Sequence, residues 1–363
     1  MRALREEADR LQATVPFVAE TMAAAEGTIA DLRIHVRGSH WDLGEVVPRR
    51  LPRVFGGDRA SARFDASSSG RLELAAWITK ADHPLTSRVM ANRIWRWLFG
   101  AGLVRSTDNF GKLGDRPTHP ELLDWLALRF VESGWSVKSL VRILVTSSAY
   151  PMSAALDEAA VALDPENRLH WRHPRRRLEV EAIRDALLAA SGDIDFTMGG
   201  SLLVTKNREY VATTVSTNAT TYDSPRRSVY LPVVRSALYE VFQAFDFADP
   251  STPNGDRDTT TVAPQALFML NSALAREASR SVARRVAVSA EADDARVDAA
   301  YRLALGRSPS AVERADALAF LERYSTALVS KADLKLDAAT RRMKTLEALA
   351  HALLSTNEFI HVE

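Results

Sequence analysis

The stretch from residue 84 to residue 125 constrains the fold more than any other part of this chain. It is dense in tryptophan, arginine and turn-forming glycine, and its apolar side chains recur at helical spacing: Val89, Ile94, Trp97 and Leu98. This periodicity predicts an amphipathic helix over residues 87–99, with one face directed toward a core. Gly100 follows at once and is expected to end that helix.

A second helix start is encoded at residues 118–121, whose sequence Thr-His-Pro-Glu has the form of a capping box. Proline is tolerated in the first helical turn, so the sequence predicts a helix from Thr118 to Glu132, with Gly134 as its stop. Similar patterns predict helices over residues 1–13, 71–79, 137–147, 178–190, 239–247 and 264–286, and roughly three more within residues 290–363.

Two regions favour strands. Residues 14–60 contain the alternating run LRIHVRG, punctuated by glycine and proline, which predicts a small N-terminal β-rich lobe. A second strand-prone region lies around residues 199–235 and includes the runs LLVT, EYVATTV and SVYLPVV. The sequence therefore predicts a predominantly α-helical α+β protein. Residues 1–13 form an N-terminal helix or linker, and residues 71–363 form a main helical domain into which the second β-rich region is inserted.

The composition limits the classes of function. Lys and Arg total 47 and Asp and Glu total 46, so the net charge of +1 gives no global field to attract nucleic acid or an anionic membrane. The absence of cysteine excludes disulfides, thiolate nucleophiles and covalent c-type haem, so no cofactor is expected in this chain. No long apolar run predicts a membrane span, and the N-terminus lacks a secretory signal core. The chain is interpreted as soluble, and as a fragment or late start of an exported parent.

The first candidate site combines aromatic and polar residues. Arg93 lies close to Trp95 and Trp97 in the sequence, and Asp108 and Asn109 follow on the next loop. Aromatic faces stack on sugar rings, and these polar side chains hydrogen bond hydroxyl groups, so a glycan site is one interpretation. The structural alternative is that Trp97 belongs to the core and that Arg93 caps a buried carbonyl or pairs with Asp108.

Three residues are candidates for acid–base chemistry. His119 stands at the predicted helix start and could serve as a general base if it faced a cleft; a structural hydrogen bond is the alternative. Asp246 and Asp258 lie in or beside a loop that contains Pro and Gly. They could divide acid and nucleophile roles in glycoside chemistry or coordinate calcium, whereas surface aspartates in a turn are the default interpretation.

Several arginines are candidates for ligand binding. Arg226 and Arg227 lead into a predicted strand, and Arg257 lies among the loop aspartates. A further basic run contains Arg172 and residues 175–177, but acidic residues follow it, so a helix start with locally paired charges is favoured. The run is short and lacks interleaved aromatic residues, so nucleic acid is not expected as a partner. His170 and His173 have metal-ligand spacing only in a helix, which Pro174 disfavours, and no metal is assigned.

The order of motifs along the chain carries a family resemblance. The motifs NRIW, DNFG, HPELLDWLA, RRRLEVEAIRDALL, RRSVYLP, FDFADP, TTVAPQAL and ALGR occur in this order. In this order they resemble the planctomycete domain of unknown function 1553, the C-terminal part of planctomycete cytochrome c domain proteins. The resemblance covers nearly the whole chain, from residues 37–38 to the C-terminal LLSTNEFIHVE. The resemblance implies an exported or periplasmic protein associated with electron transfer or polysaccharide handling, and it implies no established activity.

Three hypotheses for function follow. The leading one is an auxiliary module that binds a glycan or an acidic polysaccharide through Asp108, Asn109, Arg93, Arg226, Arg227 and Arg257. The second is a hydrolase-type carbohydrate-active enzyme that uses His119, Asp246 and Asp258. The third is an assembly scaffold that docks the cytochrome c domain of a longer parent or an operon partner. A cleft shared by the DNFG segment, Arg226, Arg227 and the FDFADP loop would favour a ligand site over a scaffold.

Overall fold

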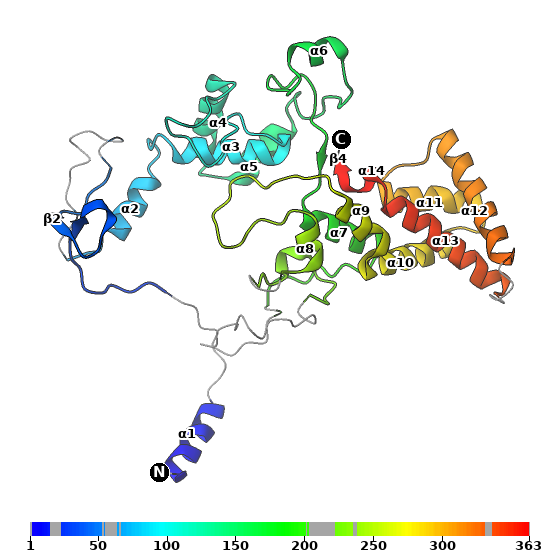
Figure 1. Cartoon of the computed structure of the whole chain (residues 1–363), viewed down its shortest axis with the longest axis horizontal. Coiled ribbons are helices and arrows are strands. Elements are labelled where there is room, and N and C mark those ends of the chain that lie inside the picture. Colours follow the sequence, from blue (N-terminus) through cyan, green and yellow to red (C-terminus); the bar gives the residue numbers. More distant parts are fainter. Residues whose placement is uncertain are drawn as a thin grey trace. The chain divides into compact units, whose positions relative to one another are not determined.

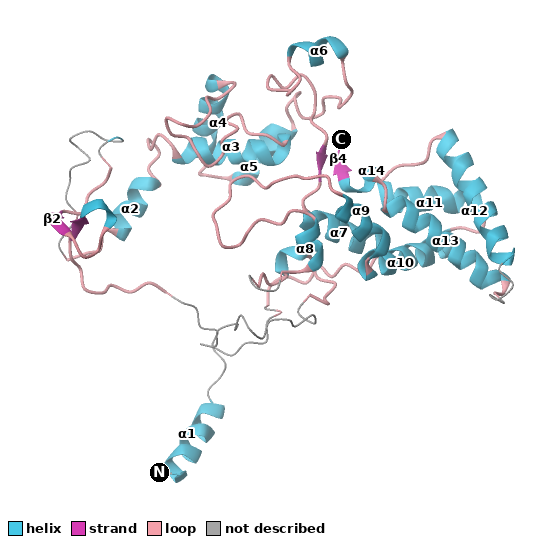
Figure 2. Cartoon of the chain, in the orientation of Figure 1, coloured by secondary structure: helices cyan, strands magenta, loops and turns pink. Residues whose placement is uncertain are grey.

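The computed structural model describes residues 2–14, 23–52, 67–200, 222–234, 238–330 and 336–362, together with residues 54, 64 and 202. Within these residues the protein is predominantly helical with two small two-stranded sheets, which confirms the predicted fold class (Figure 2). Most of the β-rich insertion predicted around residues 199–235 lies outside the described residues. The chain divides into two compact units (Figure 1): one contains Met1–Ile94 and His119–Val141, the other Trp95–Thr118, Arg142–Val204 and Val211–Glu363.

The first unit contains the predicted N-terminal helix and the predicted β-rich lobe. Its elements are α1 (Arg2–Thr14), β1 (Leu32–His35), β2 (Leu43–Val47), α2 (Arg71–Ile78), α4 (Pro120–Glu132) and the first parts of α3 (Thr86–Phe99) and α5 (Val137–Val145). β1 and β2 form an antiparallel hairpin in which Leu32 pairs with Val47. The strand expected in LRIHVRG is therefore present, although it ends at His35.

The predicted capping box at Thr118 was wrong. α4 begins at Pro120 and its N-cap is His119, whose side chain makes no capping hydrogen bond. The backbone amide of Thr118 donates to the carbonyl of Leu103 at 2.9 Å, and its hydroxyl donates to the same oxygen at 3.4 Å. Thr118 thus closes the preceding loop instead of starting the helix, while the predicted C-terminal end at Glu132 is confirmed.

The buried face of α3 also differs from the prediction. Trp97 was expected in the apolar stripe, but 46% of its surface is exposed, and Trp95 takes the buried position instead. The Trp95 ring stacks on Phe99 with ring centroids 4.1 Å apart, and His170 meets Trp95 edge-on. Ile94 of the predicted stripe is fully buried, but Trp95 lies on the opposite side of the helix from Trp97, which is left at the surface near the C-terminal end.

The second unit holds the main hydrophobic core. Its elements are α6 (Glu158–Leu163), β3 (Arg176–Arg177), α7 (Val180–Ser191), α8 (Glu240–Ala244), α9 (Ala263–Asn271), α10 (Ala273–Ser289), α11 (Asp293–Leu305), α12 (Ala311–Ser330), α13 (Ala338–Leu354), α14 (Asn357–Ile360) and β4 (His361–Val362). α10 packs against α7, α11 and α13 (Figure 1). Fully buried side chains such as Ile183, Phe242, Val282 and Leu354 fill the space between these helices.

Two predicted elements of this unit take other forms. The long helix expected over residues 264–286 is split at Ser272 into α9 and α10, because the Ser272 hydroxyl caps the amide of Ala275 at 3.2 Å and starts a new helix. The strand expected in SVYLPVV is absent from the described residues 228–234, where Ser228–Tyr230 forms a single 3₁₀ turn.

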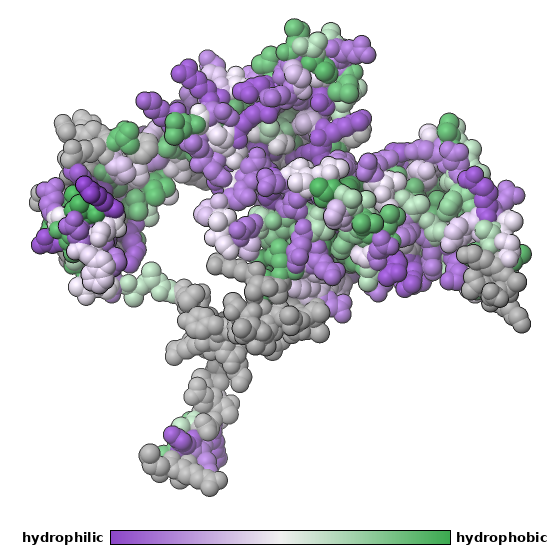
Figure 3. Space-filling model, viewed as in Figure 1, coloured by the Kyte–Doolittle hydropathy of each residue, from purple (hydrophilic) through white to green (hydrophobic). Residues whose placement is uncertain are grey.

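Some apolar side chains remain at the surface. Leu156 and Leu163, beside and within α6, are both largely exposed, and Figure 3 shows green atoms in that area. None of the described helices is both long enough and apolar enough to cross a membrane.

Candidate functional site

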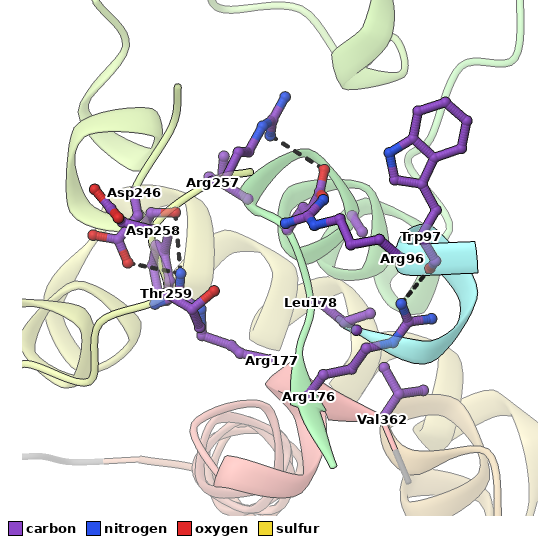
Figure 4. A pocket seen from close by; sticks show the side chains of 15 residues that line it. Arg96, Trp97, Arg176, Arg177, Leu178, Asp246, Arg257, Asp258, Thr259 and Val362 are labelled. Carbon is purple, nitrogen blue, oxygen red and sulfur yellow. Dashed lines mark hydrogen bonds and ion pairs between the residues drawn. The ribbon is translucent and has the colours of Figure 1, made fainter. Parts of the chain in front are cut away.

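A pocket of about 490 Å³ lies in the second unit, where the end of α3, the segment from β3 into α7 and the chain after α8 meet. Its lining is strongly charged and includes four arginines with one exposed tryptophan: Arg96, Arg176, Arg177, Arg257 and Trp97. In the view of Figure 4, Asp246 and Asp258 lie at one side of the pocket, Trp97 lies at the other, and arginines lie between them. Its volume falls within the usual range of small-molecule sites.

The end of α3 and the short sheet β3–β4 form one wall. Arg96 and Trp97 stand in the last turn of α3, which stops at Gly100, a residue with a left-handed φ of 79°. Arg176 donates a hydrogen bond to the carbonyl of Trp97 and so joins β3 to the helix end. Because side chains alternate along a strand, the next residue, Arg177, points away from Arg176 and toward the loop after α8.

Arg177 and Asp246 tie down that loop. The Arg177 guanidinium is only 4% exposed and donates to the Asp246 carboxylate at 2.8 Å and to the Thr260 carbonyl at 2.7 Å. Asp246 also accepts hydrogen bonds from the amide and the hydroxyl of Thr260, both at 2.9 Å. Burial acts to raise the pKa of Asp246, but hydrogen bonds from Thr260 and Arg177 outweigh it and lower that pKa. The carboxylate is therefore held in its ionised form.

Arg257 links the loop to the start of α7. Its guanidinium makes two hydrogen bonds to the Glu181 carboxylate, at 2.7 and 2.9 Å, and lies 3.3 Å from Glu179. The hydrogen bond to Glu181 raises the pKa of Arg257, so this group also keeps its charge. Arg96 completes the network through ion pairs with Asp256 and, at 3.8 Å, with Glu179.

Asp108 fixes the middle of the same loop. Its Oδ2 atom accepts a hydrogen bond from the amide of Gly255 at 2.6 Å. A Cβ atom at position 255 would overlap the Asp108 carboxylate, so only glycine allows this approach. The neighbouring Asn109 turns back on its own loop, because its Oδ1 atom accepts from the amide of Gly111 at 3.0 Å. The predicted DNFG segment and the loop of residues 249–258 are thus in contact.

The sequence-predicted site residues fall into three groups. Asp246, Arg257 and Asp258 all line the pocket, and Asp108 supports the loop that carries the last two. Among the described residues, Asp258 makes no hydrogen bond or ion pair and is exposed to solvent. These predicted residues therefore lie together, although the structure uses Asp246 and Asp108 mainly to hold the loop.

Arg226 and Arg227 form the second group and do not line the pocket. Arg226 is buried, donates to the Thr197 carbonyl at 2.6 Å and lies over the Tyr230 ring. Arg227 reaches Asp185 on α7 at 3.5 Å. The buried Arg184 lies beneath them and donates to the Arg226 carbonyl at 2.8 Å. The RRSVYLP segment is therefore bound to α7 by contacts of its own.

His119 and Arg93 belong to the first unit. His119 is the partly buried N-cap of α4. Arg93 lies on α3 and lines a small, mainly apolar hollow of that unit with Phe130 and Trp135. Neither residue lines the pocket of the second unit.

The sequence interpretation missed how the charges at the start of α7 are used. Arg177, Glu179 and Glu181 were expected to pair with near neighbours, but Arg177 pairs with Asp246, and both glutamates contact Arg257. These partners are separated by 69 to 78 positions, so no local spacing reveals them. The available signal was compositional: the chain carries clustered arginines in one segment and clustered aspartates in another.

His170 and His173 pack around an aromatic cluster. Their rings lie 6.0 and 6.1 Å from the Phe99 ring, and burial followed by the charge of Arg176 lowers the pKa of His173. His170 has a left-handed φ of 55°, so the two histidines are not on one helix. Among the side chains that the structure describes, no group of three or more His, Cys, Asp or Glu residues is placed to hold a metal ion.

The pocket is chemically suited to binding. A proton donor must be protonated before it acts, and Asp246 is kept ionised by hydrogen bonds from Thr260 and Arg177. The network instead presents planar, preoriented polar groups next to an exposed indole. Such groups form hydrogen bonds in fixed directions, which suits recognition of a ligand rich in hydroxyl groups.

No curated protein and no solved structure matches the chain. One family does match, over residues 70–321, a span that contains every element of the pocket except the strand β4. Its description is a protein of unknown function (DUF1553). The chain therefore belongs to the PSD1 family of proteins of unknown function (DUF1553).

Proposed function

We propose that the chain is an auxiliary module that binds a glycan in the pocket of the second unit. The observation that carries the proposal is the exposed Trp97 indole beside a network of arginines and carboxylates that are already oriented by one another. Sugar rings offer an apolar face for stacking and hydroxyl groups for hydrogen bonds. In this proposal the module serves an exported, cytochrome c-associated protein, as the family resemblance implies.

Binding is better supported than hydrolysis. The carboxylate of Asp246 is occupied by Thr260 and Arg177, and its lowered pKa removes it as an acid at neutral pH. A retaining or inverting glycosidase needs one protonated carboxyl group and a second, ionised one that is free to act as base or nucleophile. Asp258 is exposed to solvent, but the oxygens of Asp246 are already occupied, so the two do not form such a pair. The contacts of Arg226 and Arg227 outside the pocket favour the scaffold hypothesis in part, whereas the exposed Trp97 in the pocket favours a ligand site.

A glycan array screened with the intact chain tests this proposal. We expect binding to at least one class of oligosaccharide, and we expect Trp97→Ala to weaken it by about tenfold, because the loss of a stacked aromatic ring costs on the order of 1 kcal/mol. The matched control is Trp125→Ala, since Trp125 is 44% exposed on α4 and does not line the pocket. A folded chain that binds no saccharide would contradict the proposal.

A further inference from the structure

The charges around the pocket are balanced within the protein. Four arginines line it, and five carboxylates either line it or pair with those arginines: Glu179, Glu181, Asp246, Asp256 and Asp258. An anionic ligand attracted by the arginines would therefore meet at least as much negative charge. The abundance of arginine alone suggests an acidic polysaccharide, but the pairing of these arginines argues against it.

The arginine heads are also poorly accessible. Arg177 is almost fully buried against Asp246, Thr260 and Phe245, and Arg96 is mostly covered beside Asp256 and Glu179. Arg257 is held by two hydrogen bonds from its guanidinium to Glu181. Among the described residues, Arg176 is the pocket arginine that forms no ion pair with a carboxylate, and one of its donors is taken by the Trp97 carbonyl.

The groups that solvent can reach are mainly acceptors. The side chains of Glu179 and Asp256 are each about half exposed, and Asp258 is exposed as well. A carboxylate accepts hydrogen bonds and repels other anions, so these oxygens fit hydroxyl groups and oppose sulfate or uronate groups. Trp97 supplies the apolar surface beside them.

We propose that this pocket recognises a neutral, hydroxyl-rich glycan and discriminates against sulfated and uronate glycans. This inference rests on the proposed function and names the ligand class of the same site. Discrimination comes from the exposed carboxylates of Glu179 and Asp258, which line the pocket, and from Asp256 beside it. Arg96 and Arg257 hold Glu179 in position, and Arg96 also holds Asp256. Ring stacking on Trp97 supplies affinity without net charge.

The experiment is calorimetric titration of the intact chain with two sets of hexasaccharides of equal length. One set is neutral and derives from cellulose, xylan and mannan; the other derives from alginate and from sulfated carrageenan. Each titration is run at low and at physiological salt. We expect binding by a neutral hexasaccharide whose Kd changes by less than about twofold with salt, because no net charge is neutralised on binding.

Three variants sharpen the result. Trp97→Ala should weaken neutral binding by about tenfold, whereas Trp97→Tyr, which keeps a ring, should retain most of it and so separates stacking from misfolding. Asp258→Asn should weaken neutral binding by about threefold and improve binding of the sulfated probe, because it removes one exposed negative charge. The control Trp125→Ala should bind as the unmodified chain does.

The outcomes separate the two proposals. The inference would be overturned if a sulfated or uronate probe bound more tightly than the neutral probes, with an affinity that falls as salt is added and that depends on Trp97. The proposal of glycan binding would remain. Tighter, salt-sensitive binding of an amino-sugar oligomer such as chitosan hexamer would overturn the inference in the same way. A failure to bind any hexasaccharide, with the fold confirmed by circular dichroism, would overturn glycan binding itself and the inference with it.

Discussion

Two successive turns of helix α7 use arginine in contrasting ways. Near its start, Glu179 and Glu181 hold Arg257, whose side chain remains partly exposed at a pocket. One turn later, Arg184 is 2% exposed and donates to the carbonyls of Ser224 and Arg226. Both side chains are arginines held by hydrogen bonds, so their accessibility distinguishes the one that builds the fold from the one that shapes a ligand site.

The largest effect is expected from Arg184→Met. The carbonyl of the buried Arg226 and the partly buried carbonyl of Ser224 would lose this donor, which should lower the free energy of unfolding by roughly 2–4 kcal/mol. Arg227→Met is the matched control, because Arg227 is half exposed and reaches Asp185 only at 3.5 Å, and it should change stability by less than about 0.5 kcal/mol. Chemical denaturation measures the free energy of unfolding of both variants. If both lost a similarly small amount, the contrast between buried and exposed arginines would be contradicted.

A smaller loss of stability is expected from Arg257→Met. The substitution leaves the Glu181 carboxylate without its two hydrogen bonds. Because this carboxylate is partly exposed and solvent can hydrate it, the free energy of unfolding should fall by only about 1 kcal/mol. A double-mutant cycle with Glu181→Gln should give a coupling energy of similar size. A coupling as large as the loss from Arg184→Met would show that the pocket arginine is as structural as the buried one.

The smallest effect concerns Arg307, which is more exposed than either of these and pairs with Glu313 and Glu358. Its hydrogen bond to Glu313 lowers the pKa of that carboxyl from 4.5 to about 2. Because the pKa of Glu313 is lower in the folded state than in the unfolded state, its ionised form stabilises the fold at pH values above the unfolded-state pKa of 4.5. This stabilisation is lost as the pH falls from 4.5 to about 2. Glu313→Gln should therefore flatten the stability profile in that window.

The control for the acid experiment is Glu132→Gln, which removes one carboxylate of the exposed Arg129–Glu132 pair. Thermal unfolding followed by circular dichroism across the acid range measures both variants. An unchanged acid profile for Glu313→Gln would show that exposure cancels the contribution of the Arg307 network.

Local patterns predicted the helices well and the contacts of the site poorly. Apolar periodicity located α3, α4 and α7 to within a few residues, because it reports which face is buried. It misplaced Trp97, since Trp95 and Trp97 stand two positions apart and only the packing of Phe99 and His170 decides between them.

The pocket required information that spacing does not carry. Asp246, Arg257 and Asp258 were named from a cluster of charges, but their partners Arg177 and Glu181 lie about 70 residues away along the chain. Arg226 and Arg227 were expected at the same site as a pair of arginines that leads into a predicted strand. Arg226 differs from the pocket arginines because it is buried against Thr197 and Tyr230. This burial depends on the tertiary fold, so the local sequence does not reveal it.

The most direct test of the central claim is an NMR titration of the tryptophan indole N–H signals with the neutral hexasaccharide that binds best. The claim is that the start of α7, where Glu181 holds the accessible Arg257, serves a ligand, while the next turn, which carries the buried Arg184, serves the fold. We predict that the Trp97 signal shifts and saturates with the calorimetric Kd, while the Trp125 signal and the guanidinium signal of Arg184 stay in place. Saturating binding of the hexasaccharide with no shift of the Trp97 indole signal would contradict the account.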